Sequence, residues 1–293
     1  MGSSSRNRIL RVALAAVVLM VAGLPGGSLH AQSKPKLSAE EIARLMDNPV
    51  GELIQLPIQY DRLSVRSPQG DDARAVTTVK VIPTFPLGRG RWRLVNRLVV
   101  PHVGLPDSPL GDGPSGFGDL TYVGALTPSS SSDLGRGKLI WAVGPTLVLP
   151  TAGEGSLGQG KYQLGPAAAV AYLGPRLTLG LFGQHWWSVA GDAARASVSQ
   201  TNLQYFWYLR LPEQWAIGAS PSITIDWKAA GGTAVDVPLG IGLNKTLFLG
   251  PLPARVAAEV TRHVITSGDG PEPTWGFRLS VTPVIPAFIL RGR

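Results

Sequence analysis

The sequence predicts an all-β protein, an antiparallel transmembrane β-barrel of about twelve strands with an N-terminal signal peptide and one short helix. Three observations support this prediction: hydrophobic and polar residues alternate over many segments, the links between these segments alternate in length, and turn-forming residues are abundant. Of the 293 residues, 44% are hydrophobic, 16% are charged, 36 are glycine and 25 are proline. An ordinary soluble domain has roughly 25% charged residues.

The N-terminus has the features of a secretory signal peptide. Arg6, Arg8 and Arg11 precede an apolar run over residues 12–24, and Pro25 follows that run. The run is too short to span a bilayer, so we expect residues 1–31 to be removed. A retained anchor helix is the alternative.

A short helix is expected next. Ser38 and Glu41 have the spacing of a capping box, and Ile42 and Met46 share one helical face. The assignment is therefore a signal peptide at 1–31, a short periplasmic helix and linker at 32–50, and an outer-membrane β-barrel at 51–290.

Beyond the helix the hydrophobic period changes to two. In the clearest segment, Trp92, Leu94 and Leu98 alternate with Arg93 and Arg97. The expected strands cover residues 54–61, 76–86, 91–100, 117–127, 139–149, 163–172, 176–187, 202–210, 222–228, 236–247, 254–262 and 274–282. Strands of roughly ten residues cross an outer membrane when they are tilted.

The links between strands alternate in length, as in barrels whose short turns face the periplasm. The short links are 87–90, 173–175, 212–214 and 250–253, and the long ones are 63–75, 104–116, 150–162, 188–200, 229–235 and 264–273. The link from Thr127 to Lys138 breaks the rule, because it is long but falls on the short-turn side. Either this turn is extended or the strand count is off at this point.

One stretch, GSLGQGKYQLGP from Gly155 to Pro166, comes close to a phosphate-binding loop. Such a loop needs Ser or Thr after the lysine and a helix behind it. Here Tyr162 stands in that position, and Gly165 and Pro166 oppose a helix. We therefore expect the outer loop of a hairpin, with glycines that serve turn geometry.

All eight tryptophans fall in or beside expected strands, often near an end. Amphipathic rings prefer the membrane interface, which predicts an aromatic girdle. The tryptophans assigned to this interface are Trp92, Trp141, Trp187, Trp207, Trp227 and Trp275. The alternative is a set of core tryptophans in a soluble sandwich.

The polar residues on the opposite parity are candidates to line a pore. They are Arg91, Arg93, Arg97, Asp119, Asn202, Gln204, Arg210, Thr224, Asp226, Glu259 and Arg278. The three arginines of one strand predict a positive ladder that faces Asp119, Asp226, Glu259 and Arg278 and favours anionic solutes. Equally, these residues could fill a narrow barrel with ion pairs.

Several kinds of chemistry find no support in the sequence. There is no cysteine, and none of the four histidines has metal-ligand spacing, so we expect no metal and no cofactor. No G-x-S-x-G motif occurs, and His185 beside Trp186 fits the girdle better than a catalytic site. The net charge of +8 comes from scattered residues, which argues against a nucleic-acid partner.

Several segments carry a resemblance to a known family, among them SGFGDLTYVGALTP (115–128), the stretch 141–172 and GQHWWSVAG (183–191). From about Asn48 to Pro286 the chain resembles the bacterial outer-membrane family named for the MetA pathway of phenol degradation. The resemblance implies a barrel in the bacterial outer membrane that passes small, often aromatic or apolar, molecules. It offers no catalytic residues.

The function expected from these patterns is passive transport of a small-molecule solute, without enzymatic activity. The expected partners are outer-membrane lipid, lipopolysaccharide and the barrel-insertion machinery. Two alternatives remain open: a plugged barrel that supports envelope integrity, and a barrel lipid hydrolase.

Overall fold

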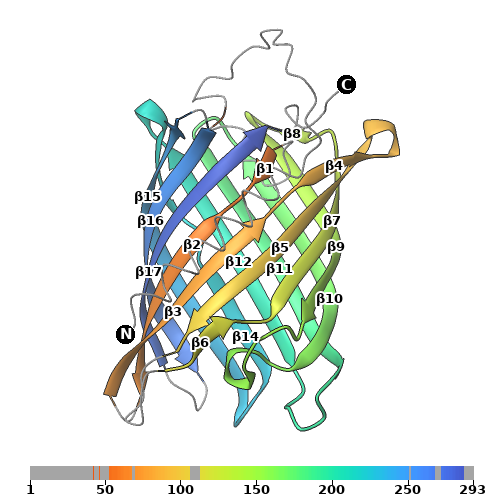
Figure 1. Cartoon of the computed structure of the whole chain (residues 1–293). Helices are drawn as coiled ribbons and strands as arrows, with labels where there is room; N and C mark the ends of the chain where they lie inside the picture. Colours follow the sequence, from red (N-terminus) through yellow and green to blue (C-terminus); the bar gives the residue numbers. More distant parts are fainter. Residues whose placement is uncertain are drawn as a thin grey trace. The chain divides into compact units, whose positions relative to one another are not determined.

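The computed structural model describes residues 53–67, 70–105, 113–250, 252–267 and 272–286, together with Ile42 and Met46. Within these ranges the chain forms a closed antiparallel sheet of seventeen segments, which combine into twelve barrel strands (Figure 1). The predicted fold class is confirmed. The signal peptide at 1–31 and most of the expected helix at 32–50 lie outside the described residues, although Ile42 and Met46 are helical.

Eight barrel strands are single segments. They are β5 (Trp92–Gly104), β9 (Gly137–Leu149), β10 (Lys161–Leu173), β11 (Leu177–Gly191), β12 (Ser199–Arg210), β15 (Gly232–Leu249), β16 (Leu252–Ser267) and β17 (Glu272–Pro286). The four others combine β1 (Leu53–Gln55) with β2 (Ile58–Ser67), β3 (Gly70–Val81) with β4 (Thr84–Leu87), β6 (Ser115–Phe117) with β7 (Leu120–Pro128) and β8 (Ser132–Leu134), and β13 (Trp215–Ala219) with β14 (Ser222–Ala229). Three short 3₁₀ turns are η1 (Gly88–Gly90), η2 (Gly155–Leu157) and η3 (Pro212–Gln214).

Three of the interruptions in these strands coincide with prolines. Pro57 separates β1 from β2, Pro83 separates β3 from β4, and Pro221 separates β13 from β14. Proline has no backbone N–H, so it cannot donate to the strand ladder at these points.

The barrel closes between its last and first strands. β17 pairs with β16 on one side and with β2 on the other, so that Leu279 lies opposite Tyr60. Closure leaves the sheet without an open edge, which is the condition for a sheet that lies in lipid.

Burial alternates along the strands in the way that the sequence predicts. On β9, Ile140 and Ala142 are buried while Trp141 and Val143 are exposed. On β15 the exposed residues include Leu239 and Ile241, which are 57% and 60% exposed. The exterior is therefore apolar, as in barrels that face lipid. In the described part of the chain, no helix is long and apolar enough to cross a membrane.

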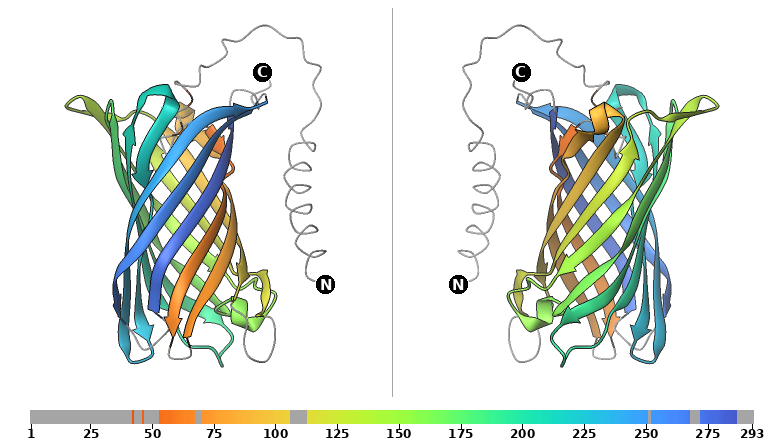
Figure 2. Two further views of the ribbon diagram at one scale, coloured as in Figure 1. Left: turned by 90° about the vertical axis from the view of Figure 1, so that its left-hand side faces the viewer. Right: turned by 90° about the vertical axis from the view of Figure 1, so that its right-hand side faces the viewer.

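The link from Thr127 to Lys138 is an extended hairpin rather than an irregular loop. β8 continues the barrel strand of β6 and β7, pairs with the start of β9, and turns at Gly135 and Arg136. This hairpin projects at the end of the barrel that carries β1 and β4 (Figures 1 and 2). The strand count is thus correct, and the turn is extended.

Candidate functional site: the barrel lumen

The barrel encloses a cavity of about 280 Å³ with two chemically different walls. One wall is apolar and is formed by Val95, Val123, Ala125, Ile140, Ala142, Ala169, Ala171, Phe182 and Phe206. The other wall is polar and is formed by Gln59, Lys80, Arg97, Gln204, Tyr208, Ser220, Asn244, Arg255, Glu259, Arg278, Ser280 and Thr282. Because most of the apolar side chains are small, that wall leaves space in the bore.

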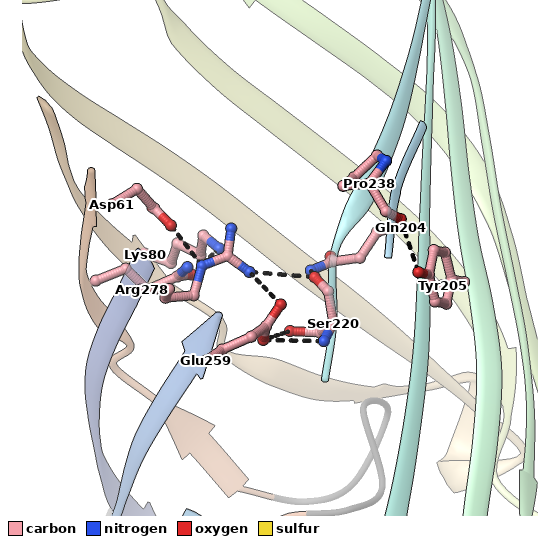
Figure 3. A network of polar contacts seen from close by, with 9 residues as sticks. Asp61, Lys80, Gln204, Tyr205, Ser220, Pro238, Glu259 and Arg278 are labelled. Atoms are coloured by element: carbon pink, nitrogen blue, oxygen red, sulfur yellow. Dashed lines mark hydrogen bonds and ion pairs between the residues drawn. The ribbon is translucent and has the colours of Figure 1, made fainter. Parts of the chain in front are cut away.

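Arg278 is the centre of the polar wall (Figure 3). Its Nε atom donates to Oδ1 of Asp61 at 2.5 Å, and its Nη1 atom lies 3.9 Å from Oε1 of Glu259. Both carboxylates therefore face the same guanidinium. Such charge-assisted contacts are stronger than hydrogen bonds between neutral groups.

Ser220 connects this cluster to the opposite strands. Its carbonyl oxygen accepts from Nη1 of Arg278 and from Nε2 of Gln204, both at 3.1 Å, and its backbone N–H donates to Oε2 of Glu259 at 3.0 Å. Ser220 and Pro221 separate β13 from β14. The interruption of the ladder thus makes the backbone groups of Ser220 available to lumen side chains.

Two further cations lie on the polar wall. Nζ of Lys80 donates to Oε1 of Gln59. The guanidinium of Arg97 lies over the ring of Phe182, 4.8 Å from its centroid. Because three barrel strands separate β5 from β11 on this side of the sheet, this contact crosses the bore.

Of the eleven residues expected to line a pore, Arg97, Gln204, Glu259 and Arg278 line the cavity. The predicted ladder of three arginines does not lie along it. Arg91 follows η1 at the end of the barrel. Arg93 is the register partner of Thr127 and lies between η1 and the part of β5 that lines the cavity. On the inward face of β5, the residue next to Arg97 in the cavity wall is Val95. The row of arginines is therefore interrupted at this position.

Four more expected residues do not line this cavity. Arg210 donates to the carbonyls of Gly174 and Pro175, both at 2.9 Å, in the turn before β11. Asp226 accepts the backbone N–H of Lys228. Finally, Asn202 and Thr224 are register partners on β12 and β14.

Asp119 does not belong to the lumen cluster, and its expected position opposite the arginines is wrong. Its carboxylate accepts the backbone N–H groups of Ala152 and Gln159 at 3.1 and 2.7 Å, and so holds the loop that contains η2. A Cβ atom on Gly158 would lie 2.5 Å from Oδ1 of Asp119, so a larger residue at position 158 would collide with this carboxylate. Within the stretch that comes close to a phosphate-binding loop, the backbone N–H of Gln159 is therefore bound by a carboxylate of this chain.

The six tryptophans assigned to the interface are distributed toward both ends of the barrel. Trp92 and Trp141 contact each other edge to face near η1, with ring centroids 6.1 Å apart. Trp187, Trp227 and Trp275 are about half exposed near the opposite end, and Trp207 is half-buried on β12. The wider expectation of eight girdle tryptophans fails at Trp186. Its ring is buried and its Nε1 atom donates to Thr146.

His185 belongs to a small outward-facing cluster of polar and aromatic side chains. Its Nδ1 atom is 2.7 Å from the hydroxyl of Thr201, and its ring packs against Trp187. The indole of Trp227 donates to the same hydroxyl. Over the described residues, no group of three or more His, Cys, Asp or Glu could hold a metal ion.

Lys80, Phe182, Ser220 and Arg255 also line the cavity, and sequence reasoning did not select them. The parity of residues 76–86 could have identified Lys80, because Thr78 and Lys80 share one face. Pro221 could have indicated the interruption beside Ser220.

Neither the protein-family models nor the curated proteins contain a match to this chain. Similarity is found among solved structures. An outer-membrane channel of Pseudomonas putida F1 aligns with a TM-score of 0.62 at 16% identity, over 88% of this chain and 100% of that one. The outer-membrane phospholipase A of Escherichia coli aligns with a TM-score of 0.40 at 10% identity, over 80% of this chain and 91% of that one. Because the sequence identity is only 16%, the similarity to this channel shows a shared fold and nothing further.

Three features agree: a closed barrel of twelve strands, an apolar exterior, and the fold of a solved outer-membrane protein. A closed barrel is one of the two architectures that satisfy every backbone polar group in lipid. The chain is therefore an outer-membrane β-barrel, located in the bacterial outer membrane.

Proposed function

We propose that this barrel is a passive channel or transporter for small organic molecules. The observation that carries the proposal is the cavity in the lumen, which polar and charged side chains border on one side. A barrel with only a structural role needs no such space, because its bore can be filled with large side chains. Here Ala125, Ala142, Ala169 and Ala171 occupy the wall instead.

The size of the cavity favours small solutes. Ligand pockets in proteins commonly measure roughly 300–1,000 Å³. A cavity of about 280 Å³ lies just below this range, which suits single-ring molecules better than lipids or peptides.

We further propose membership of the outer-membrane family named for the MetA pathway of phenol degradation. The proposal rests on the segments 115–128, 141–172 and 183–191. Its implied partners are a small solute, lipopolysaccharide in the surrounding leaflet, and the barrel-insertion machinery. The proposed maturation removes residues 1–31, which N-terminal sequencing of the exported protein would test.

Liposome swelling tests the transport proposal. Liposomes that contain the purified full-length barrel should swell in small sugars and in aromatic acids, faster than liposomes without protein. No solute-dependent swelling would favour the plugged, structural barrel. Release of fatty acid from phospholipid or lipid A by the same preparation would favour the lipid hydrolase and contradict a purely passive role.

A further inference from the structure

The cations of the polar wall differ in whether a carboxylate contacts them. Four cations line the cavity: Lys80, Arg97, Arg255 and Arg278. Among the described residues, the carboxylates that contact Lys80, Arg97 or Arg278 are Glu259 in the wall and Asp61 beside it, and both contact Arg278. Positive charge therefore exceeds negative charge around the cavity.

Arg97 differs from Arg278 in its contacts. Within the described part of the chain, no carboxylate contacts its guanidinium, and its buried Nε atom has no hydrogen-bond partner. Its charge is instead directed at the face of Phe182. A cation held over an aromatic ring keeps its N–H donors available at the rim of the guanidinium.

Lys80 adds a second cation close to Arg97. The charges of Arg97 and Arg278 repel its ammonium group, and the carboxylates of Asp61 and Glu259 attract it. The side-chain oxygen of Gln59 satisfies only one of its three donors. An anion placed between Lys80 and Arg97 would reduce this repulsion and would accept the unused donors of both side chains.

The apolar wall lies across the same cavity and offers a different kind of contact. Phe182 and Phe206 provide aromatic surface, and the ring of Phe206 lies so close to Gly180 that a Cβ atom there would be 2.1 Å from it. The ring of Phe206 therefore packs over the backbone of Gly180 and leaves room beside the alanines. A flat apolar body fits this space, and its burial is favourable.

We propose that the lumen binds small organic monoanions with an aromatic body, with the carboxylate between Arg97 and Lys80 and the ring against Phe182 and Phe206. This inference rests on the proposed function, because it names the class of solute that the bore would select. A neutral aromatic would leave the cations unpaired, and a small anion without a ring would leave the apolar wall unused.

Equilibrium binding to the full-length barrel in a nonionic detergent tests the proposal without requiring an open channel. The probes are benzoate, benzyl alcohol and acetate, measured by calorimetry. Benzoate should bind at least about tenfold more tightly than either of the others, because only benzoate engages both walls. Equal binding of benzyl alcohol would overturn the proposal.

Variants of Arg97 separate charge from structure. In Arg97→Gln, benzoate affinity should fall by about tenfold or more, whereas Arg97→Lys should retain most of it. The matched control is Arg262→Gln. Arg262 also lies over an aromatic ring, that of Trp275 at 5.2 Å, but alternation along β16 places it on the outer face. Unchanged benzoate affinity in Arg97→Gln would contradict the proposed site.

The outcomes of binding and swelling are independent. Benzoate binding without any solute-dependent swelling would leave the site intact and overturn the proposed transport function. Swelling without benzoate binding would support a channel and overturn the selectivity proposed here. A gel shift on heating confirms that each variant is folded before either measurement.

Discussion

Arg278 on β17 and Asp61 on β2 link the last strand of the barrel to the first, with 2.5 Å between Nε and Oδ1. The two residues are 217 positions apart in the sequence and are direct register partners. Their contact therefore lies at the junction that closes the barrel. It also fixes the guanidinium that holds Glu259 and the carbonyl of Ser220.

Asp61→Asn should destabilise the closed barrel. The change removes one charge from a partly exposed ion pair, so we expect a loss of about 1–3 kcal/mol in the free energy of unfolding. Urea unfolding in detergent, followed by tryptophan fluorescence, would measure it. The double variant Asp61→Asn, Arg278→Gln should lose less than the sum of the single changes. Strict additivity would show that the two side chains do not interact.

Asp119 should control the order of the loop that contains η2. Asp119→Ala removes the acceptor of two backbone N–H groups, so residues 151–160 should become more accessible to protease. The matched control is Glu154→Ala, since Glu154 is exposed in the same loop. Cleavage rates of the folded barrel within this loop provide the measurement. Equal rates in both variants would assign no anchoring role to Asp119.

Most of the fold could be predicted from the sequence, because each barrel strand repeats one simple pattern. Trp141 and Val143 are exposed while Ile140 and Ala142 are buried, as period-two alternation requires. Strand ends were predicted less well. β15 and β16 extend to 18 and 16 residues, because their hairpins continue beyond the apolar segment that generated the prediction.

The candidate site could be predicted only in part. Parity correctly placed Arg97 on the cavity side of β5, since parity follows from local geometry. It could not show that Asp119 binds a loop 40 residues away, because that contact depends on how the loop folds. Nor could it show that Arg97 reaches Phe182 on β11, which depends on the curvature of the closed sheet.

A polar pair on the outer face should contribute to stability in lipid. The hydroxyl of Tyr122 donates to Oδ1 of Asn96 at 2.6 Å, and the tyrosine ring covers Gly124 to reach it. Tyr122→Phe would leave the amide without this partner in an apolar environment, at a cost of about 1–2 kcal/mol. Asn96→Leu combined with Tyr122→Phe should restore stability in lipid vesicles. If the double variant were as unstable as Tyr122→Phe, the hydrogen bond would not be the cause.

Neighbouring residues on β17 allow a direct test of which face is wet. Ser280 lines the cavity, whereas Leu279 is 45% exposed on the outer face. Because the chain has no cysteine, Ser280→Cys and Leu279→Cys each create a single reactive thiol. In vesicles, a water-soluble methanethiosulfonate should modify the thiol at 280 at least about tenfold faster than the thiol at 279, since the reactive thiolate forms in water.

The charge of the reagent extends this test to the field in the bore. Lys80, Arg97 and Arg278 should attract an anionic methanethiosulfonate to the thiol at 280 and disfavour a cationic one. The preference should fall as salt is added, because screening weakens the attraction. Arg97→Gln should reduce the preference, whereas Arg262→Gln on the outer face should not. Faster reaction at 279 than at 280 would reverse the assignment of the two faces, and a cationic preference at 280 would contradict a positive lumen.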